Sequence, residues 1–149
     1  MPNNSYRDKR IMDDCIFCKI VKGEIPSYRV YEDDDILAML DINPFSKGHL
    51  LVLPKEHFEN IYDIPTELFS KLITKSKKIA EVLKEKLNPE GMILQQNSGE
   101  KAGQSVHHIH IHLKPVYKDT DIPAEKHLRQ ELTQEELQEI HSLLLLEEL

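Results

Sequence analysis

Four of the eight histidines of this 149-residue chain fall within residues 107–112, in strict alternation with apolar residues from position 108 onward. Side chains of a strand point to alternate faces, so this spacing predicts a strand over residues 106–113 with imidazoles on one face. The histidines of that face are His108, His110 and His112, and the apolar residues between and after them are Ile109, Ile111 and Leu113. Half-buried polar groups are costly without partners, so the polar face predicts a ligand or a polar cleft.

Two chemistries suit three imidazoles on one strand face, and the residue pattern alone does not choose between them. Neutral imidazole is a good ligand for zinc, and alternate histidines occur in zinc sites. A neutral imidazole can also attack phosphorus while neighbouring imidazoles donate hydrogen bonds to the phosphoryl oxygens. A solvated histidine-rich strand without chemistry is the third alternative. His107 has the opposite parity, so we expect it on the surface or in packing.

The rest of the chain predicts an α+β fold built on an antiparallel sheet. Apolar residues three and four apart predict one long helix over residues 65–87, which Asn88 and Pro89 end. From Thr133 onward an acidic opening followed by leucines predicts a C-terminal helix, which we interpret as a packing or dimer-contact helix. Short apolar segments predict the strands, at residues 29–32, 36–40, 50–53, 92–96 and 106–113.

Length and charge limit the function classes. The chain suits a single domain over residues 15–149, preceded by a polar tail over residues 1–14. The net charge of −7 argues against a broad cationic face for duplex nucleic acid. Its apolar runs fall far short of the roughly 20 residues that span a bilayer. The polar start lacks the apolar segment of a secretory signal, so we expect a cytoplasmic protein without membrane partners.

The two cysteines, Cys15 and Cys18, form one CxxC motif. Two cysteines so close together cannot build a disulfide framework, so the motif indicates metal or redox chemistry. It supplies at most two ligands of a four-coordinate zinc site, and histidine is the natural donor of the other two. A free dithiol or redox pair is the alternative.

Several ordered motifs resemble the histidine-triad (HIT) family. His108-Ile109-His110-Ile111-His112-Leu113-Lys114 resembles its triad, with Gly103-Gln104-Ser105-Val106 upstream. The segment from Gly48 to His57 resembles its GHxLVxPKxH stretch, and the opening from Cys15 resembles its zinc-carrying bacterial members. The resemblance covers residues 15–117 and departs at Lys114, where the family usually has an apolar residue, and at His107, where an aromatic residue is frequent.

The resemblance implies a HIT-like fold of about five antiparallel strands with one long helix, paired into a homodimer by joining two sheets edge to edge. It further implies that His110 attacks the α-phosphorus of a nucleotide and that water then releases a nucleoside monophosphate. By the same resemblance His112 would donate a hydrogen bond to a phosphoryl oxygen, and His49 would stand behind the triad as its partner. A structural core histidine is the alternative interpretation of His49.

Substrate contacts follow from the same resemblance. Ser105, with the backbone amides near Gly103 and Gln104, would hold the phosphate and the leaving group. Asp41 would accept hydrogen bonds from the ribose hydroxyls, and Ile42 would pack on the base or sugar of a nucleotide, with purine nucleotides favoured. Asn97 would lie near the phosphate. Judged from the residues alone, Asp41 and Asn97 are turn residues.

The resemblance also completes the metal site. Cys15, Cys18, His57 and His108 would bind a structural zinc, and no organic cofactor is implied. A zinc-bound His108 could not act freely as an acid, which would leave catalysis to His110 and His112. Two further functions remain open: a nucleotide-binding regulatory module with little turnover, and a zinc hydrolase with His108, His110 and His112 as ligands. The sequence offers that hydrolase no evident carboxylate base beside the triad.

Overall fold

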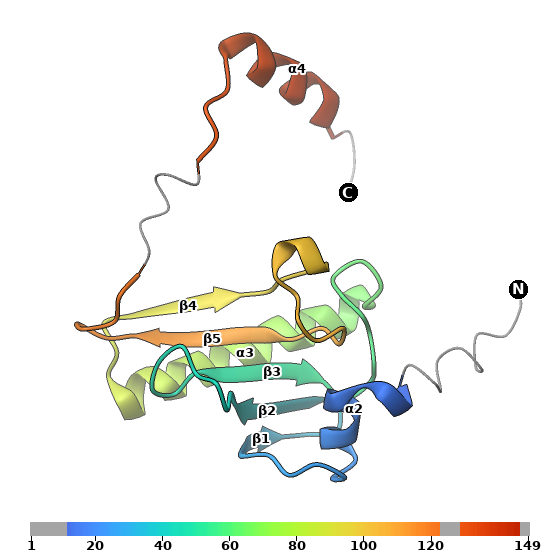
Figure 1. Ribbon diagram of the computed structural model, residues 1–149, viewed down its shortest axis with the longest axis vertical. Helices are drawn as coiled ribbons and strands as arrows, with labels where there is room; N and C mark the ends of the chain where they lie inside the picture. The colour runs from blue at the N-terminus through green and yellow to red at the C-terminus, as the bar shows by residue number, and fades with distance from the viewer. Residues whose placement is uncertain (1–11, 123–128, 147–149) are drawn as a thin grey trace, which may run out of the picture.

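The computed structural model of the chain describes residues 12–122 and 129–146, and one antiparallel sheet forms its centre (Figure 1). The strand order is β1-β2-β3-β5-β4, and every neighbouring pair is antiparallel. The strands are β1 Arg29–Glu32, β2 Ile36–Leu40, β3 Leu50–Pro54, β4 Gly91–Gln95 and β5 Ile111–Val116. The predicted α+β class and five-stranded sheet are confirmed. Of the predicted tail over residues 1–14, residues 1–11 lie outside the described residues.

The long helix α3, Thr66–Leu87, covers one face of the sheet (Figure 1). Pro65 precedes its first turn in an extended conformation, and Asn88 ends it in the left-handed conformation, with φ of 47°. Leu72 on its inner face packs against buried residues of β2, β3 and β5. Ile109, Ile111 and Leu113 belong to the same cluster, so the apolar half of the histidine run faces the core as predicted.

A shorter helix, α2 Ile16–Val21, lies on the opposite face of the sheet. Cys15 caps its N-terminus, where the Cys15 sulfur accepts a hydrogen bond from the Cys18 amide. Phe17 and Ile20 of α2 pack against Leu37 and Leu51 of the sheet. The polar half of the histidine run shares this face, because Phe17 lies against the rings of both His108 and His110.

The strand predicted over residues 106–113 is wrong in its first half, because β5 begins only at Ile111. Residues 104–110 do not pair with β3, and the chain bends at residues 106–108. Their backbone groups have other partners: the Ile109 amide donates to the Phe58 carbonyl, and the His108 carbonyl accepts from the His110 ring. The bend turns the ring of His108 away from the line of His110 and His112.

The predicted C-terminal helix is present as α4, Gln134–Leu144. Thr133 caps it through a reciprocal pair of hydrogen bonds with Glu136. No residue of α4 is buried, and Figure 1 places the helix apart from the sheet and α3. Among the described residues, no helix combines the length and apolar character that crossing a membrane requires.

Leu72→Ala should lower the free energy of unfolding by about 2–5 kcal/mol, because it empties a fully buried position beneath α3. The control is Ile73→Ala on the same helix, where the side chain is 37 % exposed and the loss should be at most about 1 kcal/mol. Urea denaturation of both variants measures the difference. Equal losses would contradict the packing of α3 on the sheet described above.

Candidate active site and metal centre

The three histidines of the run belong to two separate clusters. His110 and His112 lie together, with ring centroids 4.9 Å apart, and His49 of the β2–β3 loop stands beside His112. His108 instead joins Cys15, Cys18 and His57. The three imidazoles therefore do not converge on one point as predicted: only His110 and His112 lie together, because the backbone bend re-aims His108.

One hydrogen bond fixes the protonation of the His110 ring. Its Nδ1 lies 2.7 Å from the carbonyl oxygen of His108, and a carbonyl can only accept, so Nδ1 carries the proton. The other nitrogen, Nε2, is then unprotonated and has a free lone pair. Burial lowers the pKa of His110. The ring is therefore neutral at pH 7, the form that a nucleophile requires.

A chain of three groups sets the protonation of His112. The Phe45 amide donates to Nδ1 of His49 over 2.9 Å, so His49 carries its proton on Nε2. That Nε2–H donates to Nδ1 of His112 over 3.0 Å, which leaves His112 with its proton on Nε2. Burial, with His110 and His49 nearby, lowers the pKa of His112 to about 4. His112 thus offers one N–H donor to a neighbouring anion at neutral pH.

The second cluster has the donor set and spacing of a tetrahedral zinc site. Nδ1 of His108 lies 3.5 Å from each of the sulfurs of Cys15 and Cys18 and 3.2 Å from Nδ1 of His57. Nδ1 of His57 lies 3.4 Å from the Cys18 sulfur. Tetrahedral zinc with nitrogen and sulfur ligands separates neighbouring ligand atoms by about 3.3–3.8 Å. These separations lie in or close to that range, and all four ligand atoms lie within 4.8 Å of one another, so the four residues fit a zinc ion.

The protonation of these ligands also suits a metal. Nε2 of His108 lies 2.7 Å from the Pro54 carbonyl and must donate to it, so Nδ1 keeps a lone pair for the metal. Burial and the neighbouring Cys15 raise the pKa of the Cys18 thiol to about 12. A buried thiol of this kind gives up its proton when a cation binds, so metal binding and proton release are coupled here.

A third group, Asp41 with His49 and His112, also brings potential metal ligands together. The hydrogen bonds speak against a metal there: Nδ1 of His49 accepts from the Phe45 amide, so the Nε2 that faces His112 carries the proton. The zinc hydrolase with His108, His110 and His112 as ligands fails for a related reason. Nδ1 of His108 faces the cysteines, and its Nε2–H is bound to the Pro54 carbonyl.

The loop between β2 and β3 places Asp41 and Ile42 beside the cluster of His49, His110 and His112. One carboxylate oxygen of Asp41 accepts from the Asn43 amide over 2.8 Å, so the turn role expected from the residues alone is real. The other oxygen lies 3.6 Å from Nε2 of His49 and keeps acceptor capacity. The Ile42 side chain is 77 % exposed, so its apolar surface is open to solvent.

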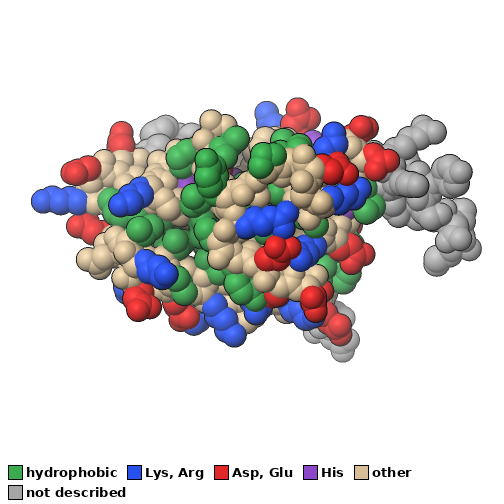
Figure 2. All heavy atoms as spheres, turned by 90° about the horizontal axis from the view of Figure 1, so that it is seen from below, with side chains coloured by type: hydrophobic (Ala, Val, Ile, Leu, Met, Phe, Trp, Pro, Cys, Tyr) green, Lys and Arg blue, Asp and Glu red, His purple; other side chains and the backbone are tan. Residues whose placement is uncertain are grey.

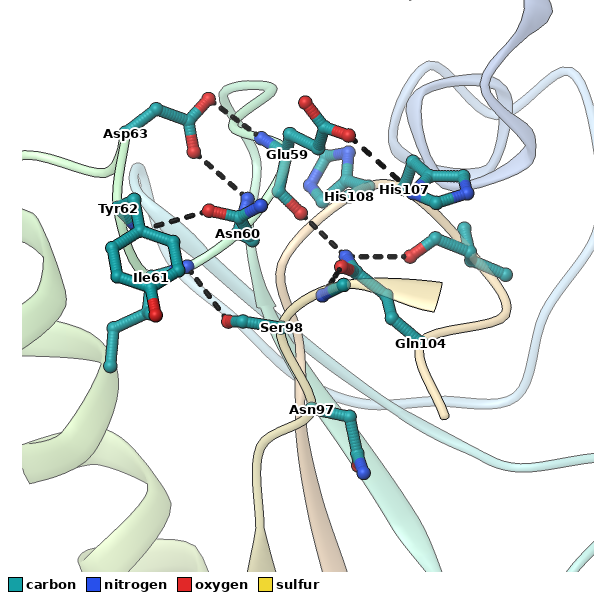
Figure 3. A network of polar contacts seen from close by, with 12 residues as sticks. Glu59, Asn60, Ile61, Tyr62, Asp63, Asn97, Ser98, Gln104, His107 and His108 are labelled. Carbon is teal, nitrogen blue, oxygen red and sulfur yellow. Dashed lines mark hydrogen bonds and ion pairs between the residues drawn. The ribbon is translucent and has the colours of Figure 1, made fainter. Parts of the chain in front are cut away.

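The loop that precedes the histidines is held by its own polar groups, as Figure 3 shows. By the family resemblance, the backbone amides near Gly103 and Gln104 would hold a phosphate. They donate instead to the carbonyls of Glu100 and Gly99, so neither is available to a phosphate. The buried Gln104 side chain is fully engaged as well, with the Gly99 amide and with the carbonyls of Glu59 and Val106. Ser105 alone of the predicted phosphate contacts is exposed without an internal partner among the described residues.

Asn97 shapes the same loop. Its amide nitrogen donates to the Ala102 carbonyl over 2.6 Å, and its oxygen accepts from Gln95. Nearby, Ile61 donates its amide to the hydroxyl of Ser98, which ties the 58–63 loop to the 96–104 loop (Figure 3). These groups position the segment that carries the histidines.

A nucleophilic nitrogen must be unprotonated, so the sequence predicts that the other ring nitrogen of His110 donates to a backbone carbonyl or similar acceptor, and the His108 carbonyl is that acceptor. Sequence reasoning did not identify which carbonyl accepts. It missed the Phe45 amide and the Pro54 carbonyl, which fix the tautomers of His49 and His108. The Phe17 ring, 5.0 Å from His110 and perpendicular to it, was also missed, although its place inside the CxxC motif put it near a metal ligand.

Comparisons with known proteins agree with this geometry. The family model described as HIT domain matches residues 22–119. A protein of Bacillus subtilis named Protein hit is 48 % identical over 109 residues, 73 % of this chain and 75 % of the relative. An adenosine 5'-monophosphoramidase of Candida albicans is 43 % identical over 68 % of this chain and 69 % of its own length. An adenylylsulfatase of Arabidopsis thaliana is 35 % identical over 80 % and 60 % of the two chains.

Solved structures give the same result. The crystal structure of a HIT family member from Bacillus subtilis superposes with a TM-score of 0.79 at 43 % identity, covering 87 % of this chain and 94 % of that one. A zinc-bound histidine triad protein from Mycobacterium smegmatis superposes with a TM-score of 0.72 at 33 % identity, over 89 % and 99 % of the chains. With its fold, its histidine motif and its relatives in agreement, this chain belongs to the HIT family.

Proposed function

We propose that the protein is a nucleotidyl hydrolase or transferase in which Nε2 of His110 attacks the α-phosphorus of a nucleotide. Suitable substrates are nucleoside phosphoramidates, acyl-adenylates and dinucleoside polyphosphates, and the product is a nucleoside monophosphate. The observation that carries the proposal is the bond from Nδ1 of His110 to the His108 carbonyl. It leaves one neutral, unprotonated imidazole nitrogen beside the N–H donor of His112.

The reaction proceeds in two displacements. In the first, the bond from Nε2 of His110 to phosphorus forms while the bond from phosphorus to the leaving group breaks. The leaving group takes a proton from solvent water. His110 is then a cationic nucleotidyl-imidazolium whose Nδ1–H still donates to the His108 carbonyl. In the second, water attacks phosphorus, loses a proton to solvent, and releases the monophosphate with neutral His110.

The groups around His110 match the charge that the reaction moves. The Nε2–H of His112 donates to a non-bridging phosphoryl oxygen in both steps. Asp41 raises the pKa of His110 against the effect of burial, so its carboxylate favours the cationic intermediate. In the proposed binding mode, the remaining acceptor of Asp41 takes a ribose hydroxyl, Ile42 packs on the base or sugar, and Ser105 contacts the phosphate. Asn97 and Gln104 hold the loop.

The names of two relatives favour a purine nucleotide. One is an adenosine 5'-monophosphoramidase and the other an adenylylsulfatase, and both names describe cleavage of a bond to an adenylyl group. We therefore propose adenosine phosphoramidates as the first substrates to assay. A regulatory module with little turnover is the alternative, and the measured turnover number separates the two.

His110→Ala should reduce turnover of an adenosine phosphoramidate by at least about 10³-fold, because no other group supplies the attacking nitrogen. Binding of adenosine monophosphate should change by only a few-fold, since the ribose and phosphate contacts remain. Steady-state kinetics and calorimetric titration measure the two effects. His107→Ala is the control, because that ring is exposed and its ion pair within the described part of the chain is with Glu59 at the surface. A variant that keeps most of the rate would remove His110 as the nucleophile.

His49→Ala should lower turnover by roughly tenfold or more, because His112 then loses the donor that keeps its own proton on Nε2. Nitrogen NMR of labelled histidine should report a single Nε2–H tautomer of His112 in the parent protein and a mixture in the variant. The matched control is His141→Ala on α4, which leaves both readings unchanged. An unaltered His112 tautomer in His49→Ala would contradict the relay from Phe45.

We further propose that Cys15, Cys18, His57 and His108 bind a structural zinc ion. The spacing of the four ligand atoms and the zinc-bound solved relative support this assignment. When bound, the ion holds α2, the His57 loop and the histidine segment together. It takes no part in the displacement, because the reacting nitrogen belongs to His110.

Elemental analysis of the purified protein should find about one zinc per chain. Removal by a chelator should lower the melting temperature by about 5–10 °C, as expected for a ligand present at a hundred times its dissociation constant. Cys18→Ala should lose both the metal and the chelator effect, whereas Ser27→Ala should keep both. A zinc-free protein with an unchanged melting temperature would overturn the assignment.

Two other expectations stay predictions. A homodimer formed by joining sheet edges would use β1 or β4, since these are the two edge strands of the sheet. The cytoplasmic location rests on the sequence alone.

A further inference from the structure

The C-terminal helix α4 is amphipathic, and no residue of it is buried against the other described residues. Four apolar residues, spaced three and four apart, form one stripe along it, whereas acidic residues occupy its first turns. The stripe consists of Leu137, Ile140, Leu143 and Leu144, and every one of these side chains is at least 40 % exposed. A helix of 11 residues is barely stable in water without packing. The capped helix α4 therefore needs an apolar surface to cover it.

A groove with the complementary character lies between α3 and the β1–β2 edge. Its volume is about 620 Å³, and its floor is apolar, built from residues that include Val30, Leu40, Ile79 and Val82. Val30 and Val82 are about half exposed, so the groove is open to solvent. Figure 2 views the molecule from this edge and shows hydrophobic side chains gathered between cationic ones.

The rim of the groove is cationic. Lys47, Lys75, Lys78 and Lys86 all line it. Lys75 is paired with Asp33, but the other three have no carboxylate partner among the residues that the structure describes. The acidic residues of α4, Glu135, Glu136 and Glu139, supply the opposite charge. The charge and the apolar character of the groove thus both match α4.

We propose that α4 of one copy of this chain lies in the lysine-rimmed groove of a second copy. Among residues 12–122 and 129–146 of one chain, nothing covers either surface, and α4 stands apart from its own α3 (Figure 1). Two copies can satisfy both surfaces at once, because each gives its α4 and receives the other. This reciprocal exchange closes with two-fold symmetry. It uses surfaces distinct from the histidine cluster and is independent of the proposed chemistry.

Photo-crosslinking tests the contact and its direction. A benzophenone amino acid replaces Ile140 in the full chain. Protein labelled with heavy nitrogen is mixed with unlabelled protein, and the two are unfolded and refolded together before irradiation. We expect cross-links from α4 to groove peptides of α3 or β1, about half of them joining a heavy to a light peptide. The control places the same probe at Gln138, on the polar side of α4, and should give several-fold fewer cross-links.

Two variants test the nature of the contact. The double variant Lys78→Glu and Lys86→Glu should reduce the cross-link yield roughly fivefold, as expected for lost and reversed exposed ion pairs. Lys101→Glu, outside the groove, should not change it. Val82→Glu should reduce the cross-link yield several-fold, whereas Ile73→Glu on the same helix should not. Cross-links only between peptides of one isotope, cross-links outside the groove, or equal behaviour of Val82→Glu and Ile73→Glu would overturn the proposal.

Discussion

Both clusters depend on His108. The His108 ring donates to the Pro54 carbonyl and presents Nδ1 to the cysteines, and the His108 carbonyl accepts a hydrogen bond from Nδ1–H of His110. One residue therefore holds a position in the metal centre and fixes the protonation of the proposed nucleophile. Any shift of the His108 backbone would move both groups together, which explains why this segment is buried and bound on both sides.

Residues 106–110 lack the strand pairing with β3 that a regular strand would make, and this allows the His108 ring to reach the cysteines. A regular strand through residues 106–110 would send the His108 ring in the same direction as the His110 ring. The bend costs ladder hydrogen bonds, and these are replaced by the bond from the Ile109 amide to the Phe58 carbonyl. Ile109 still reaches the core, so the apolar face of the run is kept. The polar side chains divide between two clusters, His108 in one and His110 with His112 in the other.

Much of this fold follows from the sequence, because periodicity reports burial directly. The stripe of α3, the strands and the core position of Ile111 are all consequences of alternating or helical apolar spacing. The start of β5 at Ile111 and the identity of the backbone groups that fix the histidine tautomers did not follow, because alternation fixes which face a side chain takes and leaves open whether its backbone is paired. The Asp41 turn shows the same limit, since a turn role and a ligand role use different oxygens of one carboxylate.

Neutral histidines suit the anionic substrate that we propose. Burial lowers the pKa values of His49, His110 and His112, so in that mechanism the phosphate meets the single free N–H of a neutral His112. In the proposed mechanism, attack creates a positive charge on His110. Burial disfavours that charge in the resting ring, whereas the nearby Asp41 carboxylate favours it. A permanently cationic side chain at the same place would hold the phosphate equally well before and after attack, and would lower the barrier less.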